Sequence, residues 1–365
     1  MALLWLLLAC GLTLVLQGLV LGRGALRKLT YERHFSTGVC YAGDRIEMVE
    51  VIENGKLLPV PWLRLEAMLP SSLIFKRSRE MTISEGNIYQ NHTSLFTIRP
   101  RTRITRTHQL QCVRRGIYRI DSATMTGGDL FALFTPTRQI RIDRRLVVYP
   151  ALLSEDELPS SWKTWQGELA VRRWMVQDPF LITGIRGYAP GDPMNRIHWK
   201  ATARSGELQV HQNGFTADPQ VMILLNIEES ERMWNVVTRP EIVEEAFSYA
   251  ATCAALLLHQ GMAAGFGHNA SVQQEHQDML RLEPEYGSAQ LDRILEAMAA
   301  ADMKIRMSFF EFLRLEAGRE HETTLDYLLV TAHLSEPVRE GIRLLEQQGH
   351  RVTLAGWPEN KEAVV

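Results

Sequence analysis

The sequence predicts a multidomain α+β protein with an N-terminal transmembrane helix, an antiparallel β-sandwich and a C-terminal α/β domain built on a parallel sheet. Three observations predict it: residues 1–22 are apolar and uncharged, short alternating strands continue to about residue 150, and apolar strands alternate with amphipathic helices from about residue 220. The chain of 365 residues is long enough for two domains, and 45% hydrophobic and 22% charged residues is a globular composition. A net charge of -2 gives no sign of a nucleic-acid partner.

The N-terminal run, residues 1–22, has the length of a transmembrane helix. Its one strongly polar side chain is Gln17, and a rise of about 1.5 Å per residue lets such a helix span roughly 30 Å of hydrocarbon. A cleaved signal peptide is the alternative, but no basic residue precedes the apolar run. Arg23, Arg27 and Lys28 follow it, so the positive-inside rule predicts a single-pass protein whose bulk lies in the cytoplasm.

Residues 29–150 have the pattern of a β-sandwich. Residues 45–53 alternate charged and apolar side chains and end at the turn pair Asn54-Gly55. Further short strands are expected at 94–98, 109–113, 117–120, 139–142 and 146–149. Six arginines between residues 99 and 115 form either the polar face of these strands or a contact for acidic lipid headgroups.

The densest motif occupies residues 184–204, inside a segment (151–214) that is expected to link the two domains. Pro190-Gly191 predicts a turn, Asp192 is placed to cap a helix, and Pro193 suits the first helical position. The predicted helix has an apolar stripe and a basic face with Trp199 beside it; the stripe is Met194, Ile197 and Ala201, and the basic face is Arg196, Lys200 and Arg204.

Two interpretations of this basic face stay open. The cations form a docking surface for an acidic partner, or they act as an internal clamp in which Arg186, Arg196 and Arg204 pair with Asp192 and other carboxylates. A phosphate site is not indicated, because no glycine-rich phosphate loop accompanies the cations.

Residues 215–365 are expected to form the α/β domain. The continuous apolar run 221–225 is typical of a strand buried on both faces. Further strands are predicted at 263–267, 327–331 and 352–354, and helices at 241–259, 289–301 and 337–348.

The motif resembles the signature of the bacterial domain-of-unknown-function family number fifty-eight. The matching residues are Arg186, Tyr188, Pro190, Gly191, Asp192, Arg196, Trp199, Lys200, Ala203 and Arg204. Gly187 departs from the pattern, because the family usually has glutamate there. The resemblance extends to the anchor and to residues 54–62 and 114–134. It implies a protein of the bacterial inner (cytoplasmic) membrane with a von Willebrand factor A-like C-terminal domain.

Domains of that type often bind a divalent cation through a D-x-S-x-S loop after their first strand. The corresponding residues here are Asn226, Glu228 and Ser230, of which only the last is retained. The later Thr-Asp-Gly loop corresponds to Thr331-Ala332-His333, without its aspartate. The loop is therefore degenerate, and we expect no metal and no cofactor.

The sequence favours a non-catalytic scaffold or adaptor over an enzyme, because it lacks G-x-S-x-G, H-E-x-x-H and Walker motifs. Membrane lipid contacts the N-terminal helix, and the family resemblance implies a MoxR-type AAA+ ATPase and a transglutaminase-like membrane protein as partners. The alternative is a membrane-tethered metal-dependent hydrolase that uses His268, Glu275 and His276. Cys10, Cys40, Cys112 and Cys253 have no C-x-x-C spacing, which argues against a disulfide framework or a zinc knuckle.

Overall fold

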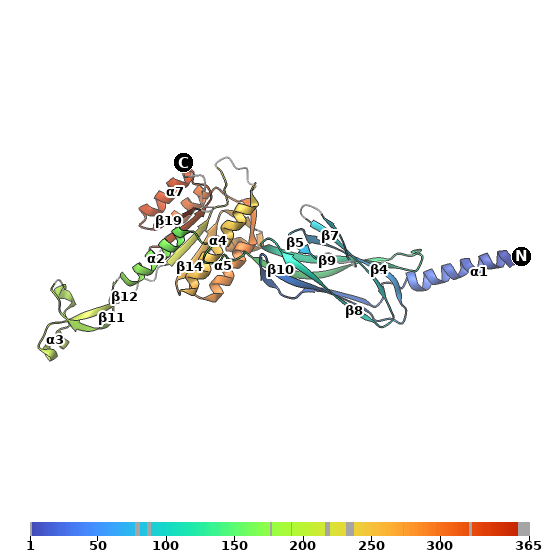
Figure 1. The fold of residues 1–365 in the computed structure, drawn as a ribbon, viewed down its shortest axis with the longest axis horizontal. Coiled ribbons are helices and arrows are strands. Elements are labelled where there is room, and N and C mark those ends of the chain that lie inside the picture. Colours follow the sequence, from blue (N-terminus) through green and yellow to red (C-terminus); the bar gives the residue numbers. More distant parts are fainter. Residues whose placement is uncertain are drawn as a thin grey trace. The chain divides into compact units, whose positions relative to one another are not determined.

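A computed structural model describes residues 2–76, 81–85, 89–175, 177–190, 192–215, 220–230, 237–272, 274–320 and 323–356. The chain is a mixed α/β protein with an apolar N-terminal helix and several sheets, as predicted (Figure 1). It divides into two compact units. Residues 1–151 with 298–300 form the first unit, and residues 152–297 with 301–365 form the second.

Helix α1 (Ala2–Gln17) continues into a π-helical turn, Gly18–Gly22. Leu3–Gly22, 20 residues, is long and apolar enough to cross a membrane. Its leucines from Leu3 to Leu19 are exposed, which suits a helix surrounded by lipid. The Thr13 hydroxyl donates to the carbonyl oxygens of Ala9 and Cys10, so this polar group is satisfied within the helix.

Two β-sheets follow in the first unit. The four-stranded sheet has the order β1 (Leu29–Phe35), β3 (Arg45–Asn54), β8 (Arg103–Cys112), β5 (Leu73–Phe75). The six-stranded sheet has the order β2 (Val39–Tyr41), β10 (Thr137–Tyr149), β9 (Gly116–Gly128), β4 (Val60–Pro70), β7 (Tyr89–Ile98), β6 (Met81–Glu85). Alternate residues of both sheets point inward and form two shared apolar clusters, so the sheets pack face to face.

One pairing departs from the predicted antiparallel pattern, because β2 pairs with β10 in parallel. A parallel pair needs a long connection between its strands. The chain supplies it here, since nearly the whole sandwich lies between Tyr41 and Thr137.

A buried ion network crosses the sandwich core. Arg33 and His108 both contact the carboxylate of Glu50, and the Tyr31 hydroxyl donates to Glu50 Oε1 at 2.8 Å. The side chains of Arg33 and Glu50 are 0% and 1% exposed. Buried charges are tolerated only when they are paired in this way. The alternating sequence pattern of β1 and β3 gave no sign that Arg33 and Glu50 would be buried.

The second unit contains a five-stranded sheet in the order β16 (Arg281–Glu285), β14 (Ala263–His268), β13 (Gln220–Leu225), β18 (Asp326–Thr331), β19 (Arg351–Gly356). All neighbours are parallel except β16, which is antiparallel to β14. The predicted strands at 221–225, 263–267, 327–331 and 352–354 are present. The predicted helices correspond to α4 (Pro240–His259), α5 (Ser288–Ala300) and α7 (Glu336–Gln347). The unit also contains elements that were not predicted: helix α6 (Phe309–Ala317) and the antiparallel pair of β15 (Ala270–Val272) and β17 (Ala301–Ile305).

The side on which the chain adds new strands switches in the middle of this sheet. From β13 it proceeds to β14 on one side, and from β18 it proceeds to β19 on the other. In open α/β sheets, ligand sites form at the carboxyl ends of the strands where such a switch occurs. The carboxyl ends of β13 and β18 are adjacent at this switch point.

Residues 151–214, the expected linker, contain secondary structure of their own. Helix α2 (Ser160–Met175) buries Trp162, whose ring lies 6.4 Å from that of Tyr249 on α4. Strands β11 (Gln177–Gly187) and β12 (Gln209–Phe215) form an antiparallel hairpin. A 3-10 turn (Met194–Arg196) and helix α3 (Trp199–Ser205) lie between them. We call residues 177–215 the motif arm.

Candidate functional site

The motif arm begins with a clamp between Arg186 and Asp192. The Arg186 guanidinium donates to both carboxylate oxygens of Asp192, at 2.7 and 2.6 Å, and the Ala189 N–H donates to Asp192 Oδ2 at 2.9 Å. The hydrogen bond from Arg186 lowers the pKa of Asp192 to about 2. These two motif residues therefore hold their own loop closed.

The predicted helix start at Asp192 is wrong. His198 caps α3 instead, because its Nδ1 accepts from the Ala201 N–H at 3.0 Å. Ile197 is extended and buried and bridges to Val210 of β12, which breaks the helix between the 3-10 turn and α3. The predicted basic face is divided in the same way: Arg196 lies outside α3, whereas Lys200 and Arg204 lie on it.

Other hydrogen bonds attach α3 to the hairpin. The His198 N–H donates to the Gln209 carbonyl at 2.7 Å, and the Gln209 N–H donates to Thr202 Oγ1 at 3.0 Å. Gly206 ends α3 in the left-handed conformation, with φ 75°, and its N–H donates to the Thr202 carbonyl. The short helix is thus held in one position by backbone contacts that its sequence alone does not reveal.

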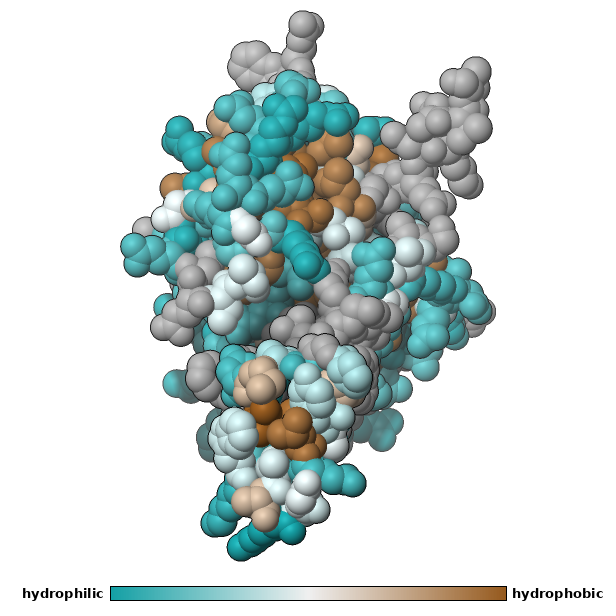
Figure 2. All heavy atoms as spheres, turned by 90° about the vertical axis from the view of Figure 1, so that its left-hand side faces the viewer, coloured by the Kyte–Doolittle hydropathy of each residue, from teal (hydrophilic) through white to brown (hydrophobic). Residues whose placement is uncertain are grey.

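A mixed apolar and basic surface results. Met194 is 65% exposed and Trp199 is 66% exposed. Lys200 and Arg204 are also exposed, and neither makes an ion pair with any residue that the structure describes. We call these four residues the motif face, and Figure 2 shows apolar atoms gathered on the surface of the motif arm.

The remaining signature residues lie in the loop. Tyr188 donates its backbone N–H to the Leu208 carbonyl at 2.8 Å, and Pro190 is exposed. Gly191 lies outside the described residues. Gly187 has open space where a Cβ would stand, so the glutamate usual in the family would fit, but no carboxylate occupies that place here.

The carboxyl ends of β13, β14 and β18 form a second candidate site. Asn226 Nδ2 donates to Thr331 Oγ1 at 3.1 Å, and Asn269 Nδ2 donates to Asn226 Oδ1 at 3.1 Å. Asn269 Oδ1 accepts from the Ile227 N–H at 3.0 Å. All three polar side chains are buried, and we call Asn226, Asn269 and Thr331 the amide cluster.

Glu228 and Ser230 flank the amide cluster. Glu228 Oε1 accepts from the Phe309 N–H at 2.9 Å, near the start of α6. Burial raises the pKa of Glu228 above its usual value. Ser230 is exposed on the loop. Within the described ranges, no three His, Cys, Asp or Glu side chains are grouped in a way that could hold a metal ion.

Sequence reasoning missed Asn269. It follows β14 directly, and a polar residue after each parallel strand is the signal that would have indicated it. Its position 43 residues beyond Asn226 gives no local hint of their contact.

The residues of the hydrolase alternative do not form a described constellation. His268 is buried between Phe247 and Phe266, and its Nδ1 accepts from the Ala270 N–H at 3.2 Å. Glu275 and His276 belong to a 3-10 segment (Gln274–Leu280), and their side chains lie outside the described residues.

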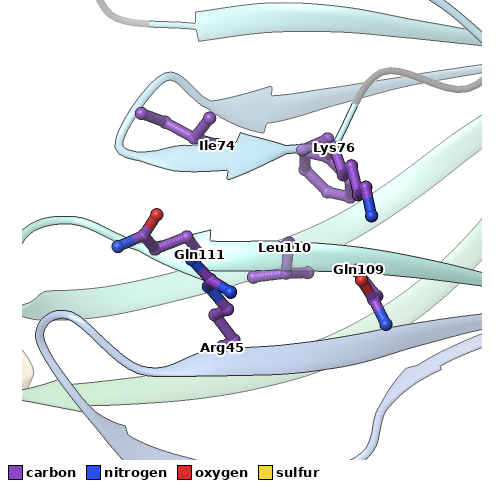
Figure 3. Close-up of a pocket in the computed structure, with 7 residues that line it drawn as sticks. Arg45, Ile74, Lys76, Gln109, Leu110 and Gln111 are labelled. Carbon is purple, nitrogen blue, oxygen red and sulfur yellow. The ribbon is translucent and has the colours of Figure 1, made fainter.

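A shallow concavity of about 410 Å³ lies on the four-stranded sheet of the first unit. Figure 3 shows Gln111 of β8 between Ile74 of β5 and Arg45 of β3, with Lys76 and Gln109 further along. Its polar lining consists of cations and amides, which can bind an anion weakly.

Residues 184–354 match the family model described as "Protein of unknown function DUF58". "Uncharacterized protein YeaD" of Bacillus subtilis (strain 168) is 22% identical over 350 residues, covering 96% of this chain and 81% of that protein.

Solved structures show only a distant likeness. The CARDB domain of the PF1109 protein in complex with di-metal ions, from Pyrococcus furiosus, has a TM-score of 0.20 and 16% identity over 33% of this chain and 91% of its own. Native alpha-2-macroglobulin from Escherichia coli has a TM-score of 0.26 and 12% identity over 33% of this chain and 23% of its own. Likeness at this level carries no inference. The family match covers residues 184–354, from the motif arm through the five-stranded sheet, and over that range the chain is similar to the DUF58 family.

Proposed function

We propose that this protein is a membrane-anchored, non-catalytic adaptor that binds a protein partner through the motif face. The observation that carries the proposal is the exposure of Trp199 and Met194 beside Lys200 and Arg204, two cations without a described ion-pair partner. Tryptophan, methionine and arginine are enriched at protein interfaces, where an aromatic anchor surrounded by charges gives both affinity and orientation. A partner with an acidic rim around an apolar pocket fits this face.

The clamp interpretation applies to a different part of the motif. Arg186 is engaged by Asp192 within the loop, so this pair shapes the arm. Lys200 and Arg204 remain available for a partner, and docking is therefore the better account of those two residues.

The C-terminal domain is von Willebrand factor A-like in this proposal. Counting the five strands of this sheet in chain order, their order across the sheet is 3-2-1-4-5 with an antiparallel third strand, which supports the assignment. The amide cluster occupies the place where such domains often hold a cation. Because the side chains of the amide cluster are satisfied by neutral hydrogen bonds, we propose that the domain acts as a binding module without a metal.

We propose Leu3–Gly22 as the anchor, and the basic residues that follow it support a location of the rest of the chain in the bacterial cytoplasm. The partners that we propose, a MoxR-type AAA+ ATPase and a transglutaminase-like membrane protein, rest on the family resemblance. An ATPase that works beside the membrane would meet the motif face on the cytoplasmic side.

The test is affinity purification of the full-length protein from detergent-solubilised membranes, with and without ATP, followed by mass spectrometry. The variant Lys200→Glu/Arg204→Glu reverses two cations four residues apart on α3. Arg339→Glu/Arg343→Glu does the same on α7, where both arginines face Glu336 and are exposed. We expect the first variant to lose the AAA+ ATPase and the second to keep it, with similar melting temperatures because surface ion pairs contribute little.

Two results would contradict the proposal. If the α3 variant still binds the partner, Lys200 and Arg204 do not belong to the docking surface. A large loss of thermal stability in that variant indicates that the cations clamp the protein internally, since breaking buried pairs is costly.

A further inference from the structure

The turn between β9 and β10 is a rigid loop built around Asp129. The Asp129 side chain accepts from the N–H groups of Phe131, Leu133 and Phe134, at 2.9, 3.3 and 2.8 Å. The Asp129 carbonyl accepts from the Trp62 indole at 2.7 Å. Asp129 is fully buried by the loop that it organises. We call residues 129–134 the hairpin tip.

The hairpin tip is attached to the end of the transmembrane helix. Gln17 Nε2 donates to Asp129 Oδ1 at 3.2 Å. A Cβ on Gly18 would stand 3.1 Å from Phe134 Cδ2, and one on Gly22 would stand 2.6 Å from Phe134 Cβ. These two glycines, one helical turn apart, leave the space that the Phe134 side chain fills. Arg23 then lies over the Phe134 ring, 5.8 Å from its centroid.

This attachment fixes the depth of the hairpin tip. Gln17 and Gly18 belong to the apolar run that ends at Gly22. At about 1.5 Å per residue, they lie roughly 6 Å inside the end of that run. The residues that contact them lie at about the same depth, which is that of the headgroup and acyl boundary.

The side chains at the hairpin tip suit that depth. Leu130 is 64% exposed, Phe131 is 63% exposed and Leu133 is 55% exposed, although all three are strongly apolar. The neighbouring β3–β4 turn adds the exposed Leu57 and Leu58. A loop that exposes several large apolar side chains next to a transmembrane helix has its natural partner in the bilayer.

Cations surround this apolar end. Lys56 donates its ammonium to the Gly24 carbonyl at 2.6 Å and also to that of Ala25. The Lys56 carbonyl accepts from the Arg101 N–H at 3.1 Å, which places the β7–β8 turn beside it. Basic residues at the level of the headgroups attract anionic lipid.

We infer that the hairpin tip is a second membrane contact, with Leu130, Phe131 and Leu133 inserted into the headgroup and acyl boundary of the bilayer that the N-terminal helix crosses. The inference rests on the membrane anchoring in the proposed function. With two contacts, the helix and the hairpin tip, the sandwich cannot swivel freely about a flexible tether and is held in one orientation to the membrane.

The test uses the full-length chain in vesicles of phosphatidylcholine and phosphatidylglycerol. Cys10→Ser removes the exposed native thiol, and the other three cysteines are buried. A nitrobenzoxadiazole label is placed at Phe131→Cys, at Leu130→Cys or, as the control, at Val113→Cys. Val113 is exposed in the β8–β9 turn, at the opposite end of the antiparallel strands. Quenching by nitroxide-labelled lipid and by aqueous iodide is then compared.

We expect the labels at positions 130 and 131 to be quenched by the lipid nitroxide and to be several-fold less quenched by iodide than the label at 113. Equal iodide quenching at all three positions overturns the inference. Alkaline carbonate extraction of the same samples separates the two hypotheses. If the protein stays in the vesicles but iodide quenches the hairpin-tip labels, the membrane anchor is supported and the second contact is overturned. If carbonate extracts the protein, both the anchor and the second contact are overturned.

Discussion

The side-chain amide of Asn226 donates a hydrogen bond to the hydroxyl of Thr331, across 3.1 Å, at the carboxyl ends of β13 and β18, where the strand order of the five-stranded sheet switches sides. The Thr331 hydroxyl in turn donates to the His333 carbonyl at 2.7 Å. A neutral chain of hydrogen bonds thus joins the carboxyl ends of β13 and β18. A carboxylate at residue 226 would need a cation to compensate its burial, whereas the amide is satisfied by its neighbours.

Asn226→Asp should destabilise the protein in the absence of divalent cations. Aspartate cannot donate to Thr331, and its buried charge would lack a counter-ion, so we expect a loss of about 1–3 kcal/mol of unfolding free energy. Magnesium should restore part of this loss, because the new carboxylate lies beside the Thr331 hydroxyl oxygen and supplies the charged oxygen ligand that Mg²⁺ prefers. Thermal unfolding with and without magnesium checks both points. A wild-type protein stabilised by magnesium as strongly as the variant would contradict the account of the amide cluster.

Glu316→Gln should be among the more costly single changes in the second unit. Arg281 donates to both Glu316 oxygens, from Nε at 2.5 Å and from Nη2 at 2.7 Å, and the Tyr327 hydroxyl donates to Oε1 at 3.1 Å. Among the described residues, the variant leaves the largely buried Arg281 with Glu283 as its one charged partner, and we expect a loss of about 3 kcal/mol. Glu340→Gln, an exposed position on α7, should stay within about 0.5 kcal/mol of wild type in the same urea titration.

His92 should make the sandwich less stable in mild acid. Burial, followed by the positive charge of Arg33, lowers the pKa of His92 from 6.5 to about 4. The unfolded chain therefore binds a proton that the folded chain does not, and stability is lost as the pH falls from about 6.5 to about 4. His108 opposes protonation of His92 and Glu50 favours it, but the net direction is downward.

Urea unfolding of wild type and His92→Gln between pH 4.5 and 7.5 measures this effect. The unfolding free energy of the variant should depend much less steeply on pH than that of the wild type. Glu50 does not titrate in this window: burial raises its pKa, but the His108 hydrogen bond and the charge of Arg33 outweigh burial and hold the pKa well below its usual range. An unchanged slope in the variant would assign the acid sensitivity to other groups.

Cys40 and Cys112 should form a disulfide when the purified protein is oxidised. Their Sγ atoms lie 3.4 Å apart across the buried core, and the hydrogen bond between the two side chains lowers the pKa of Cys40. Diamide accepts the two hydrogens, so the product should be about 2 Da lighter, and closing so long a loop should stabilise the protein by up to about 4 kcal/mol. Cys253→Ser should behave like wild type, whereas Cys40→Ser should not cross-link. In cells the proposed cytoplasmic location predicts that both thiols stay reduced.

Local sequence patterns were enough to predict most strands and helices of the second unit. The run 221–225 and the helical periodicity of 241–259 appear as β13 and α4 with boundaries within a few residues, because burial on both faces of a strand and on one face of a helix leaves a strong local signal. The alternating strands of the sandwich were recognisable for the same reason.

Long-range contacts could not be derived in this way. Cys40 and Cys112 are 72 residues apart, and Arg281 and Glu316 are 35 apart, so their contacts depend on sheet order rather than on spacing. The helix expected from Asp192 failed for a related reason. The burial of Ile197 against β12 favours an extended backbone there, and tertiary packing overrides the local capping signal.

The most direct test of the adaptor account is photo-crosslinking in intact cells, with benzoylphenylalanine in place of Trp199 in the full-length protein. Leu315, an exposed residue of α6 with 52% of its surface accessible, is the matched control position. The account predicts an adduct with an AAA+ ATPase from position 199, its loss when Lys200→Glu/Arg204→Glu is added, and no such adduct from position 315. Equal adducts from both positions, or none from position 199, would contradict the assignment of the motif face as the docking surface.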